Sequence, residues 1–341
     1  MDGFSPFNRF PFDPQFNGVA MQRTLKSAID CVGVGLHSGH RAVLSLHPGA
    51  IDSGIVFRRS DLGIDIPARF DLVVDTKLCT VLAAPGRPDV RVSTVEHVMA
   101  ALSGAGITNA VVAVDGPEIP ILDGSAGGFL FLIECVGIVE QAAPRAEIAV
   151  LRPVRVEVGD AFAELRPCAH GLETAISIDF EAPAIGAQAL SLLITPESFR
   201  DDLAAARTFT LAHEIDALQA AGLARGGSLD NAVVVDGADV LNPGGLRCAD
   251  EFVRHKLLDA VGDLALAGAP LRARLIGHRS GHAVNNQLLR ALFADDANWC
   301  MVSGSAWSGP RALPSAGSAG SLAGARDGRL APRLAIAAAP V

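Results

Sequence analysis

The sequence predicts an α+β fold, because segments with strand and helix patterns follow one another without a regular alternation. Runs rich in β-branched residues and bounded by turn formers predict strands at 43–46, 55–57, 110–114, 154–158, 175–180 and 232–235. Apolar periodicity and end signals predict helices at 93–103, 128–137, 196–203, 211–221, 251–267 and 285–292. Neither a GxGxxG nor a GxxxxGK[ST] motif occurs, which disfavours a Rossmann or P-loop fold.

The length and charge of the chain set further limits. Its 341 residues correspond to about two domains at roughly 100–200 residues each. The polar stretch EQAAPRAE interrupts the apolar pattern near the middle, so we expect an N-terminal domain over 21–143 and a C-terminal domain over 144–302. A net charge of −9 argues against broad nucleic-acid binding, because such binding needs a basic excess to displace phosphate counterions.

Both ends of the chain differ in composition from the rest. Residues 1–20 place five phenylalanines among Pro, Asn and Asp, and we expect a disordered arm there. Residues 303–341 are dominated by Ala, Gly, Ser and Pro, and we expect a mobile tail. Our hypothesis is that a protease recognises this tail, and an unchanged cellular half-life after its deletion would contradict it.

The sequence gives no sign of export or membrane insertion. No run reaches the ~20 apolar residues of a membrane span, and the N-terminus lacks the basic and apolar regions of a secretory signal. The six cysteines are scattered singly, which favours a reducing compartment over a disulfide framework. We therefore expect a cytoplasmic protein, and we take it to be a monomer.

The first candidate site is STVEH at 93–97, directly before an apolar helical run. Ser93 and Glu96 have the spacing of a capping box, in which each side chain bonds the other's backbone N–H. Glu96 and His97 also suit a general base beside a metal ligand. The two interpretations predict different effects of removing Glu96. A lost cap costs about 1 kcal/mol of stability, whereas a lost general base lowers the rate by about 10²–10⁴.

The second candidate site is the helical segment 251–268. His255, Asp259 and Asp263 follow one another at intervals of one turn and so share one stripe of the helix. The apolar residues of the separate, core-facing arc are Leu257, Leu258, Val261 and Leu264. A His and an Asp four residues apart can bind one metal ion, whereas the alternative is a solvated polar face with an ordinary i,i+4 pair.

The third candidate site is the loop GHRSGHAVNN at 277–286, which leads into a helix expected to start near Asn285. A helix N-terminus disfavours a charged imidazole, so an acid role for His282 requires a nearby carboxylate. The alternative is a loop histidine without function. Thr208, in ARTF at 206–209, has a hydroxyl that can donate to an oxyanion or cap a helix.

Together these segments resemble the zinc-dependent UDP-3-O-acyl-N-acetylglucosamine deacetylases of Gram-negative bacteria. The matching strings, in the family's order, are QRTLK (22–26), GVGLHSG (33–39), TVEH (94–97), EIPILDGSA (118–126), ARTF (206–209), GGSLDNAVVVD (226–236), LRCADEFVRHKLLDAVGDL (246–264) and SGHAVNN (280–286). They cover most of residues 21–295, and TVEH, SGHAVNN and the long string around His255 are specific. The resemblance implies two similar α+β domains, each with helices packed on small mixed sheets in two layers, and an active site between the domains.

The resemblance also implies a reaction, in which acetate is hydrolysed from UDP-3-O-(3-hydroxyacyl)-N-acetylglucosamine in the committed step of lipid A synthesis. The residues that correspond to the family's zinc ligands are His97, His255 and Asp259. Zn²⁺ is the implied cofactor, and Fe²⁺ competes for such sites of nitrogen and oxygen ligands. The catalytic residues implied are Glu96 as general base, Thr208 as oxyanion donor, and His282, kept protonated by Asp263, as proton donor to the leaving amine.

The implied substrate contacts extend over the C-terminal half. The residues concerned are Lys256 for the diphosphate, Asp179 and Phe180 for the nucleotide, and Phe209, Leu211, Ala212 and Ile215 along the acyl passage. A lipid-bearing substrate brings the enzyme near the inner leaflet without any embedded segment. We expect no nucleic-acid partner.

Two other functions remain open at this stage. A related zinc amidohydrolase would act on a different N-acyl sugar nucleotide, and substrates with varied acyl chains would distinguish it. A metal-binding regulator would need no catalytic groups, and the joint presence of Glu96, the three ligands and His282 argues against it.

Overall fold

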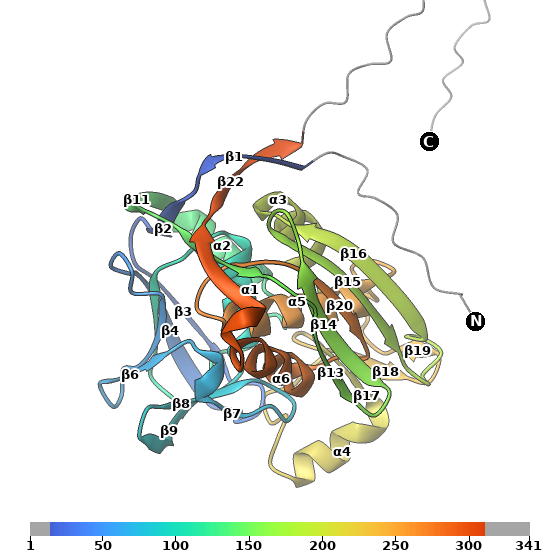
Figure 1. Cartoon of the computed structure of the whole chain (residues 1–341). Coiled ribbons are helices and arrows are strands. Elements are labelled where there is room, and N and C mark those ends of the chain that lie inside the picture. The colour runs from blue at the N-terminus through green and yellow to red at the C-terminus, as the bar shows by residue number, and fades with distance from the viewer. Residues whose placement is uncertain (1–13, 311–341) are drawn as a thin grey trace, which may run out of the picture.

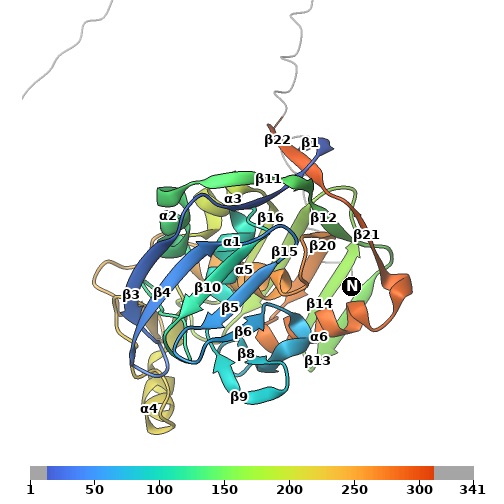
Figure 2. The ribbon, with the colours of Figure 1, turned by 90° about the vertical axis from the view of Figure 1, so that its left-hand side faces the viewer.

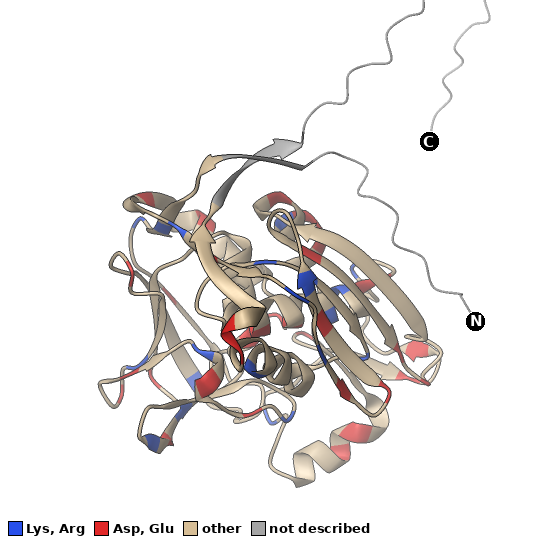
Figure 3. Ribbon diagram, viewed as in Figure 1, with Lys and Arg blue, Asp and Glu red and all other residues tan. Residues whose placement is uncertain are grey.

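The computed structural model describes residues 14–310, and it confirms the α+β class (Figure 1). Small sheets of mixed strand direction flank a central group of helices, as the view turned by 90° also shows (Figure 2). The six expected strand segments and the six expected helical segments are all present, with ends that differ by a few residues. Basic residues are interspersed with acidic ones over both halves of the fold (Figure 3).

The first half is built on a five-stranded sheet in the order β3-β4-β10-β5-β6, in which only β10 and β5 run parallel. Its strands are β3 (Ile29–Val34), β4 (Arg41–Pro48), β5 (Ile55–Arg59), β6 (Ile64–Pro67) and β10 (Ala110–Val114). Every second residue of β4 is buried, which is the period of a strand with one face on the core. The other elements of this half are β2 (Met21–Leu25), the short turn η1 (Phe70–Leu72), β7 (Val73–Asp75), β8 (Val81–Ala84), β9 (Arg87–Val92), α1 (Glu96–Gly104) and α2 (Gly127–Val136).

The second half is built on a seven-stranded sheet around β20 (Leu271–His278), which pairs antiparallel with β14 and parallel with β15 and β12. The other strands of this sheet are β12 (Ala146–Val150), β13 (Val154–Val158), β14 (Ala161–Pro167), β15 (Leu172–Asp179), β16 (Ala187–Ile194) and β21 (Trp299–Ser303). A smaller sheet contains β17 (Phe209–Leu211), β18 (Val233–Asp236) and β19 (Asp239–Val240). The helical elements are α3 (Pro196–Ser198), the π-helical turn η2 (Phe199–Leu203), α4 (Ala212–Ala220), α5 (Glu251–Ala265), α6 (His282–Phe293) and η3 (Asp296–Asn298).

Two helix predictions need correction at their ends. The helix expected from Asn285 begins three residues earlier, because the Asn285 N–H already bonds the carbonyl of Gly281 and closes the first turn of α6. The helix expected over 196–203 is a single turn, α3, followed by the wider turn η2. The earlier start of α6 places His282 at its first position.

The expected boundary between the domains falls at a connection between sheets. β11 (Ile138–Pro144) pairs antiparallel with β2, and β12 follows it into the large sheet of the second half. The division at residues 143 and 144 therefore lies at the end of β11, and two separate domains stay a prediction. No helix within residues 14–310 has the length and apolar character that a membrane crossing requires.

Parts of the expected arm and of the expected tail form strands. β1 (Pro14–Val19) pairs antiparallel with β22 (Ser305–Pro310), whereas the expected disorder of the arm and mobility of the tail stay predictions. Backbone pairing needs no particular side chains, which is why composition did not reveal it. The rest of the arm and of the tail, including most of the proposed protease-recognition segment, lies outside the described residues.

The two halves meet where α1 packs against α5. A Cβ atom added at Gly262 of α5 would lie 2.0 Å from the carbonyl oxygen of Glu96 in α1. Only glycine permits the helix backbones to come this close. The two helix backbones are therefore in close contact at the first residue of α1.

We predict that Gly262→Ala separates the two helices and lowers the free energy of unfolding by about 1–3 kcal/mol, the usual cost of overpacking. The loss would occur although alanine favours helices by about 1 kcal/mol. Urea denaturation measures it. Gly244→Ala is the control, because an added Cβ there meets nothing within 4 Å. Equal effects of the two substitutions would contradict the close crossing as the cause.

Candidate metal and catalytic site

The first candidate segment enters the site at the start of α1. Ser93 donates its hydroxyl to the carbonyl of Pro117, and Oε2 of Glu96 accepts from the N–H of Thr80 at 3.0 Å. The N-cap of α1 is Val95, without a side-chain cap. The capping-box interpretation is therefore wrong, because a partner distant in the sequence takes the Glu96 carboxylate. Glu96 and His97 are both buried.

The second candidate segment is α5, whose polar stripe points into the protein. His255, Asp259 and Asp263 are each only 3% exposed, so the solvated-face interpretation is wrong. The four residues of the expected apolar arc are buried on the other side, as the 3.6-residue period predicts. A helix buried on both faces carries charged groups at a desolvation cost unless they are paired or bind a metal.

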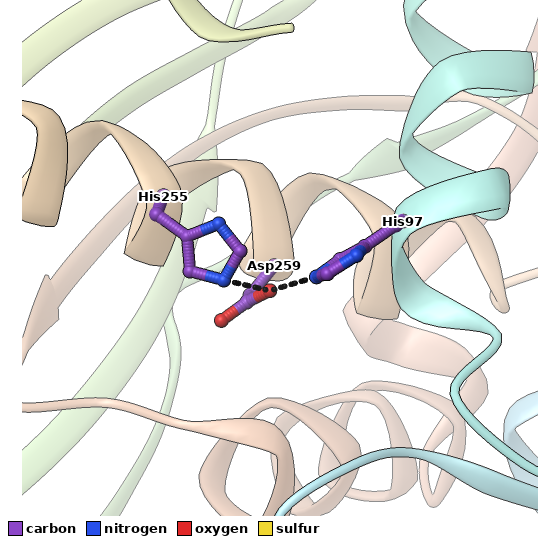
Figure 4. Close-up of side chains that lie close together, drawn as sticks. All are labelled: His97, His255 and Asp259. Atoms are coloured by element: carbon purple, nitrogen blue, oxygen red, sulfur yellow. Dashed lines mark ion pairs between the residues drawn. The ribbon is translucent and has the colours of Figure 1, made fainter. Parts of the chain in front are cut away.

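The residues His97, His255 and Asp259 form one compact cluster, with ligand atoms that all lie within 4.8 Å of one another. Nε2 of His255 lies 3.3 Å and Nε2 of His97 lies 3.6 Å from Oδ1 of Asp259, and both rings point toward that carboxylate (Figure 4). Oδ1 is buried and has no hydrogen-bond partner. An unpartnered carboxylate oxygen between two imidazole nitrogens fits a metal ion that binds all three.

The protonation of His255 also suits a ligand. Burial lowers its pKa to about 4, so its ring is neutral near pH 7. Nδ1 lies 3.1 Å from the carbonyl oxygen of Ala206 and must carry the proton, which leaves the lone pair of Nε2 for a metal. Burial also opposes ionisation of Asp259, but His255 and Lys256 hold its pKa well below the usual value.

A buried ion pair fixes the segment that supplies this carbonyl. Arg207 donates from its backbone N and from its guanidinium to Glu251, the fully buried first residue of α5. Glu251 also accepts from the backbone N of Arg247. The strand β17 and the start of α5 are thereby locked together, and the Ala206 carbonyl keeps its place beside His255.

The third candidate segment provides His282 and Asn285, which both bond the carboxylate of Asp263. Nδ1 of His282 lies 2.9 Å from Oδ2 of Asp263, which also accepts from Nδ2 of Asn285 at 2.9 Å. Burial alone would lower the pKa of His282, but Asp263 and Glu96 raise it to about 9. The carboxylate required by an acid role at a helix N-terminus is therefore present.

The pKa of the Glu96 carboxyl is affected by both His97 and His282. Burial raises its pKa above the ordinary value, and His282 and His97 offset this effect only in part. A carboxylate with a raised pKa accepts a proton more readily near neutral pH. Glu96 precedes the candidate ligand His97 in the sequence, and the charge of His282 acts on its pKa. These properties suit a general base.

Three of the residues predicted to contact the substrate or the oxyanion lie at or near the metal-ligand cluster. Nζ of Lys256 donates to Oδ2 of Asp259 at 2.8 Å, so part of its charge already balances a candidate metal ligand. The Phe209 ring packs edge-on against Phe180 and against His255, with centroids 5.5 and 6.2 Å apart. Thr208 precedes β17 and caps no helix, because the N-cap of the following helix α4 is Leu211. Its backbone bonds Gly124 and Val233.

The expected acyl passage and the nucleotide segment lie at the edge of the fold. Leu211, Ala212 and Ile215 are half-buried, and α4 has no fully buried residue. Asp179 is exposed at the end of β15, next to the half-buried Phe180. Their roles stay predictions.

Sequence reasoning missed three polar residues of the site. Thr80 bonds both Glu96 and Asp263, and the Arg207–Glu251 pair orders the Ala206 carbonyl. Their partners lie 16 to 183 positions away, so no local pattern carried a signal for the contacts.

Comparison with known proteins identifies the family of this chain. The family model of the UDP-3-O-acyl N-acetylglycosamine deacetylases matches residues 22–294. The chain belongs to this family. The match includes the described groups at 80–97, 206–209, 251–263 and 282–285.

Named relatives of this deacetylase family cover most of the chain. A UDP-3-O-acyl-N-acetylglucosamine deacetylase of Anaeromyxobacter sp. (strain Fw109-5) is 50% identical over 274 residues, 80% of this chain and 89% of the relative. Proteins of that name from Shewanella violacea and Idiomarina loihiensis are 47% and 49% identical, over 84% and 82% of this chain and 94% and 92% of theirs. The resemblance found in the sequence is thus confirmed.

We predict that His97→Ala weakens metal binding by more than about 100-fold, because even loss of a group that only supports a ligand costs 10–100-fold. Metal content after dialysis, measured by mass spectrometry, would be close to one ion per wild-type chain and far below that in the variant. His213→Ala, at an exposed position of α4, is the control. Equal metal content in wild type and His97→Ala would contradict the site.

Proposed function

We propose that this deacetylase family member hydrolyses the acetamide of UDP-3-O-[(3R)-3-hydroxyacyl]-N-acetylglucosamine to the free amine and acetate, in the synthesis of lipid A. The observation that carries the proposal is the buried His97, His255 and Asp259 cluster, with Glu96 and His282 beside it. The name shared by its relatives supports the choice of substrate.

The proposed ion is Zn²⁺, held by His97, His255 and Asp259. Two neutral imidazoles and one carboxylate suit catalytic zinc, and Fe²⁺ can take the same donor set. When bound, such an ion supplies a Lewis acid that polarises a carbonyl and lowers the pKa of water toward ~7. The remaining chemistry belongs to residues of the chain.

Glu96 is proposed as the general base for the attacking water. Its Oε2 is occupied by the Thr80 N–H, and no hydrogen bond within residues 14–310 occupies Oε1, which is therefore free to take the proton. The raised pKa of the buried carboxyl matches this role.

His282 is proposed as the cation that faces the developing negative charge and then protonates the leaving amine. Its pKa near 9 keeps it protonated at neutral pH, with Nδ1 bonded to Asp263 and Nε2 left for the substrate. The hydroxyl of Thr208 is proposed as a further donor to the oxyanion.

The remaining contacts complete the proposal. Lys256 would pair with the diphosphate, Asp179 and Phe180 would lie beside the nucleotide, and Phe209 with the half-buried face of α4 would receive the acyl chain. The apolar side chains of that face are Leu211, Ala212 and Ile215. We further propose that the enzyme acts as a monomer in the cytoplasm and meets its lipid-bearing substrate near the inner leaflet.

We predict that Glu96→Gln lowers the rate of acetate release by about 10²–10⁴, because glutamine keeps the volume and accepts the Thr80 N–H but cannot take a proton. Acetate release would be measured on metal-loaded proteins with matched melting temperatures. Glu134→Gln, at an exposed pair on α2, is the control. An active Glu96→Gln would remove Glu96 from the mechanism, and an inactive wild type would contradict the substrate.

We also predict a change in pH dependence for Asp263→Asn. His282 must be protonated to donate, so kcat/KM falls as the pH rises through its pKa. Without the carboxylate of Asp263, burial dominates and this falling limb moves to lower pH by about 1 unit or more. A bound dication lowers the starting value but leaves the direction of the shift unchanged.

The measurement is kcat/KM from pH 6 to 10, since this parameter reports groups of the free enzyme. Asp65→Asn, in an exposed pair with Arg58, is the control. An unchanged falling limb in Asp263→Asn would separate Asp263 from His282.

A further inference from the structure

Thr80 is the one residue of the described chain that hydrogen-bonds both Glu96 and Asp263. Its backbone N–H donates to Oε2 of Glu96 at 3.0 Å, and its hydroxyl donates to Oδ1 of Asp263 at 2.7 Å. Thr80 is 2% exposed and lies just before β8 in the first half. Two groups with different chemical tasks, on two different helices, are therefore tied to a single residue.

The hydrogen bond from Thr80 makes the two carboxylate oxygens of Glu96 unequal. Oε2 accepts from a backbone N–H, which keeps its proton. Oε1 is therefore the oxygen that can receive a proton from water. The carbonyl of Thr80 in turn accepts from the N–H of Val95, the residue before α1. Thr80 and the first residues of α1 are thereby fixed to each other from both sides.

The contact with Asp263 fixes the plane of that carboxylate. Oδ2 accepts from His282 and Asn285, and Oδ1 has the Thr80 hydroxyl. The terminal torsion of an aspartate is broad, so one bonded oxygen alone leaves the plane free to turn. With both oxygens bonded, the direction toward Nδ1 of His282 is set, and with it the direction of the opposite ring nitrogen.

We propose that Thr80 is a positioning residue of the deacetylation, which holds the proton acceptor Glu96 and the Asp263–His282 pair at a fixed distance and orientation. This inference rests on the proposed function. Thr80 touches neither the metal ligands nor the substrate in any described contact, so its effect is transmitted through Glu96 and Asp263. A merely structural hydroxyl would affect stability alone.

The first test compares Thr80→Val with Thr80→Ser. Valine keeps the shape and the backbone N–H but removes the hydroxyl, whereas serine keeps the donor. The free energy of a hydrogen bond to a charged group corresponds to a change of about 10- to 100-fold in rate. We expect kcat to fall by this factor in Thr80→Val, with KM changed less than about threefold. Thr80→Ser should keep kcat within about threefold of wild type.

The matched control is Thr174→Val. Thr174 is 1% exposed and donates its hydroxyl to the carbonyl of Leu192 at 2.7 Å, in the sheet pairing of β15 with β16. Its loss should lower the melting temperature about as much as Thr80→Val does, while kcat stays at the wild-type value. A comparable fall of kcat in both variants would mean that any lost buried hydroxyl has this effect, and would overturn the proposal.

A double-mutant cycle with Asp263→Asn tests the route of the effect. If Thr80 acts through Asp263, adding Thr80→Val to Asp263→Asn lowers kcat by less than about threefold further, whereas independent effects would multiply. Full multiplication would overturn the proposal, as would wild-type kcat in Thr80→Val. An inactive wild type would refute the proposed function and this inference together, but an active wild type with an equally active Thr80→Val refutes the inference alone.

Discussion

The close crossing of α1 and α5 is the constraint on which the rest of the site depends. At Gly262 the backbone of α5 lies against the carbonyl of Glu96, and this contact brings the start of α1 to the C-terminal part of α5. His97 then lies beside His255 and Asp259, and the adjacent Glu96 feels the charges of both His97 and His282. A residue larger than glycine at this crossing would separate ligands that belong to different halves of the chain.

The protonation states of the charged groups at that crossing depend on one another. The buried Glu96, Asp259 and Asp263 lie near the half-buried cations Lys256 and His282, which leaves a negative excess when all three carboxylates are ionised. Buried charge of this kind is costly unless it is paired or bound to metal. A dication at the ligand cluster reverses that excess. The same arrangement accounts for the raised pKa of Glu96 and for the cationic state of His282.

The sequence predicted contacts between residues that are close in the chain, and it missed contacts between residues that are far apart in the chain. The turn-by-turn spacing of His255, Asp259 and Asp263 lies within one helix, so periodicity alone placed them on one stripe. Ser93 and Glu96 also have a valid local pattern, but Thr80, in a different loop, takes the carboxylate instead. Family resemblance brought His97 and His282 to the same site, which no local rule could do. Hydrogen bonds between distant segments carry no signature in a single sequence.

The pairing of β1 with β22 has a mechanical consequence. Pro310 is opposite Pro14, and Ser305 is opposite Val19, so a pull on the chain beyond Pro310 opens this ladder from its outer end, one bond at a time. β21 follows as an edge strand, held by β12 alone. The elements that precede β21 in the chain are the short helical turn η3 and then α6, which carries His282 and Asn285. Force on the C-terminal end therefore passes along the chain from β22 to β21, and then through η3 to the helix that carries two residues of the candidate site.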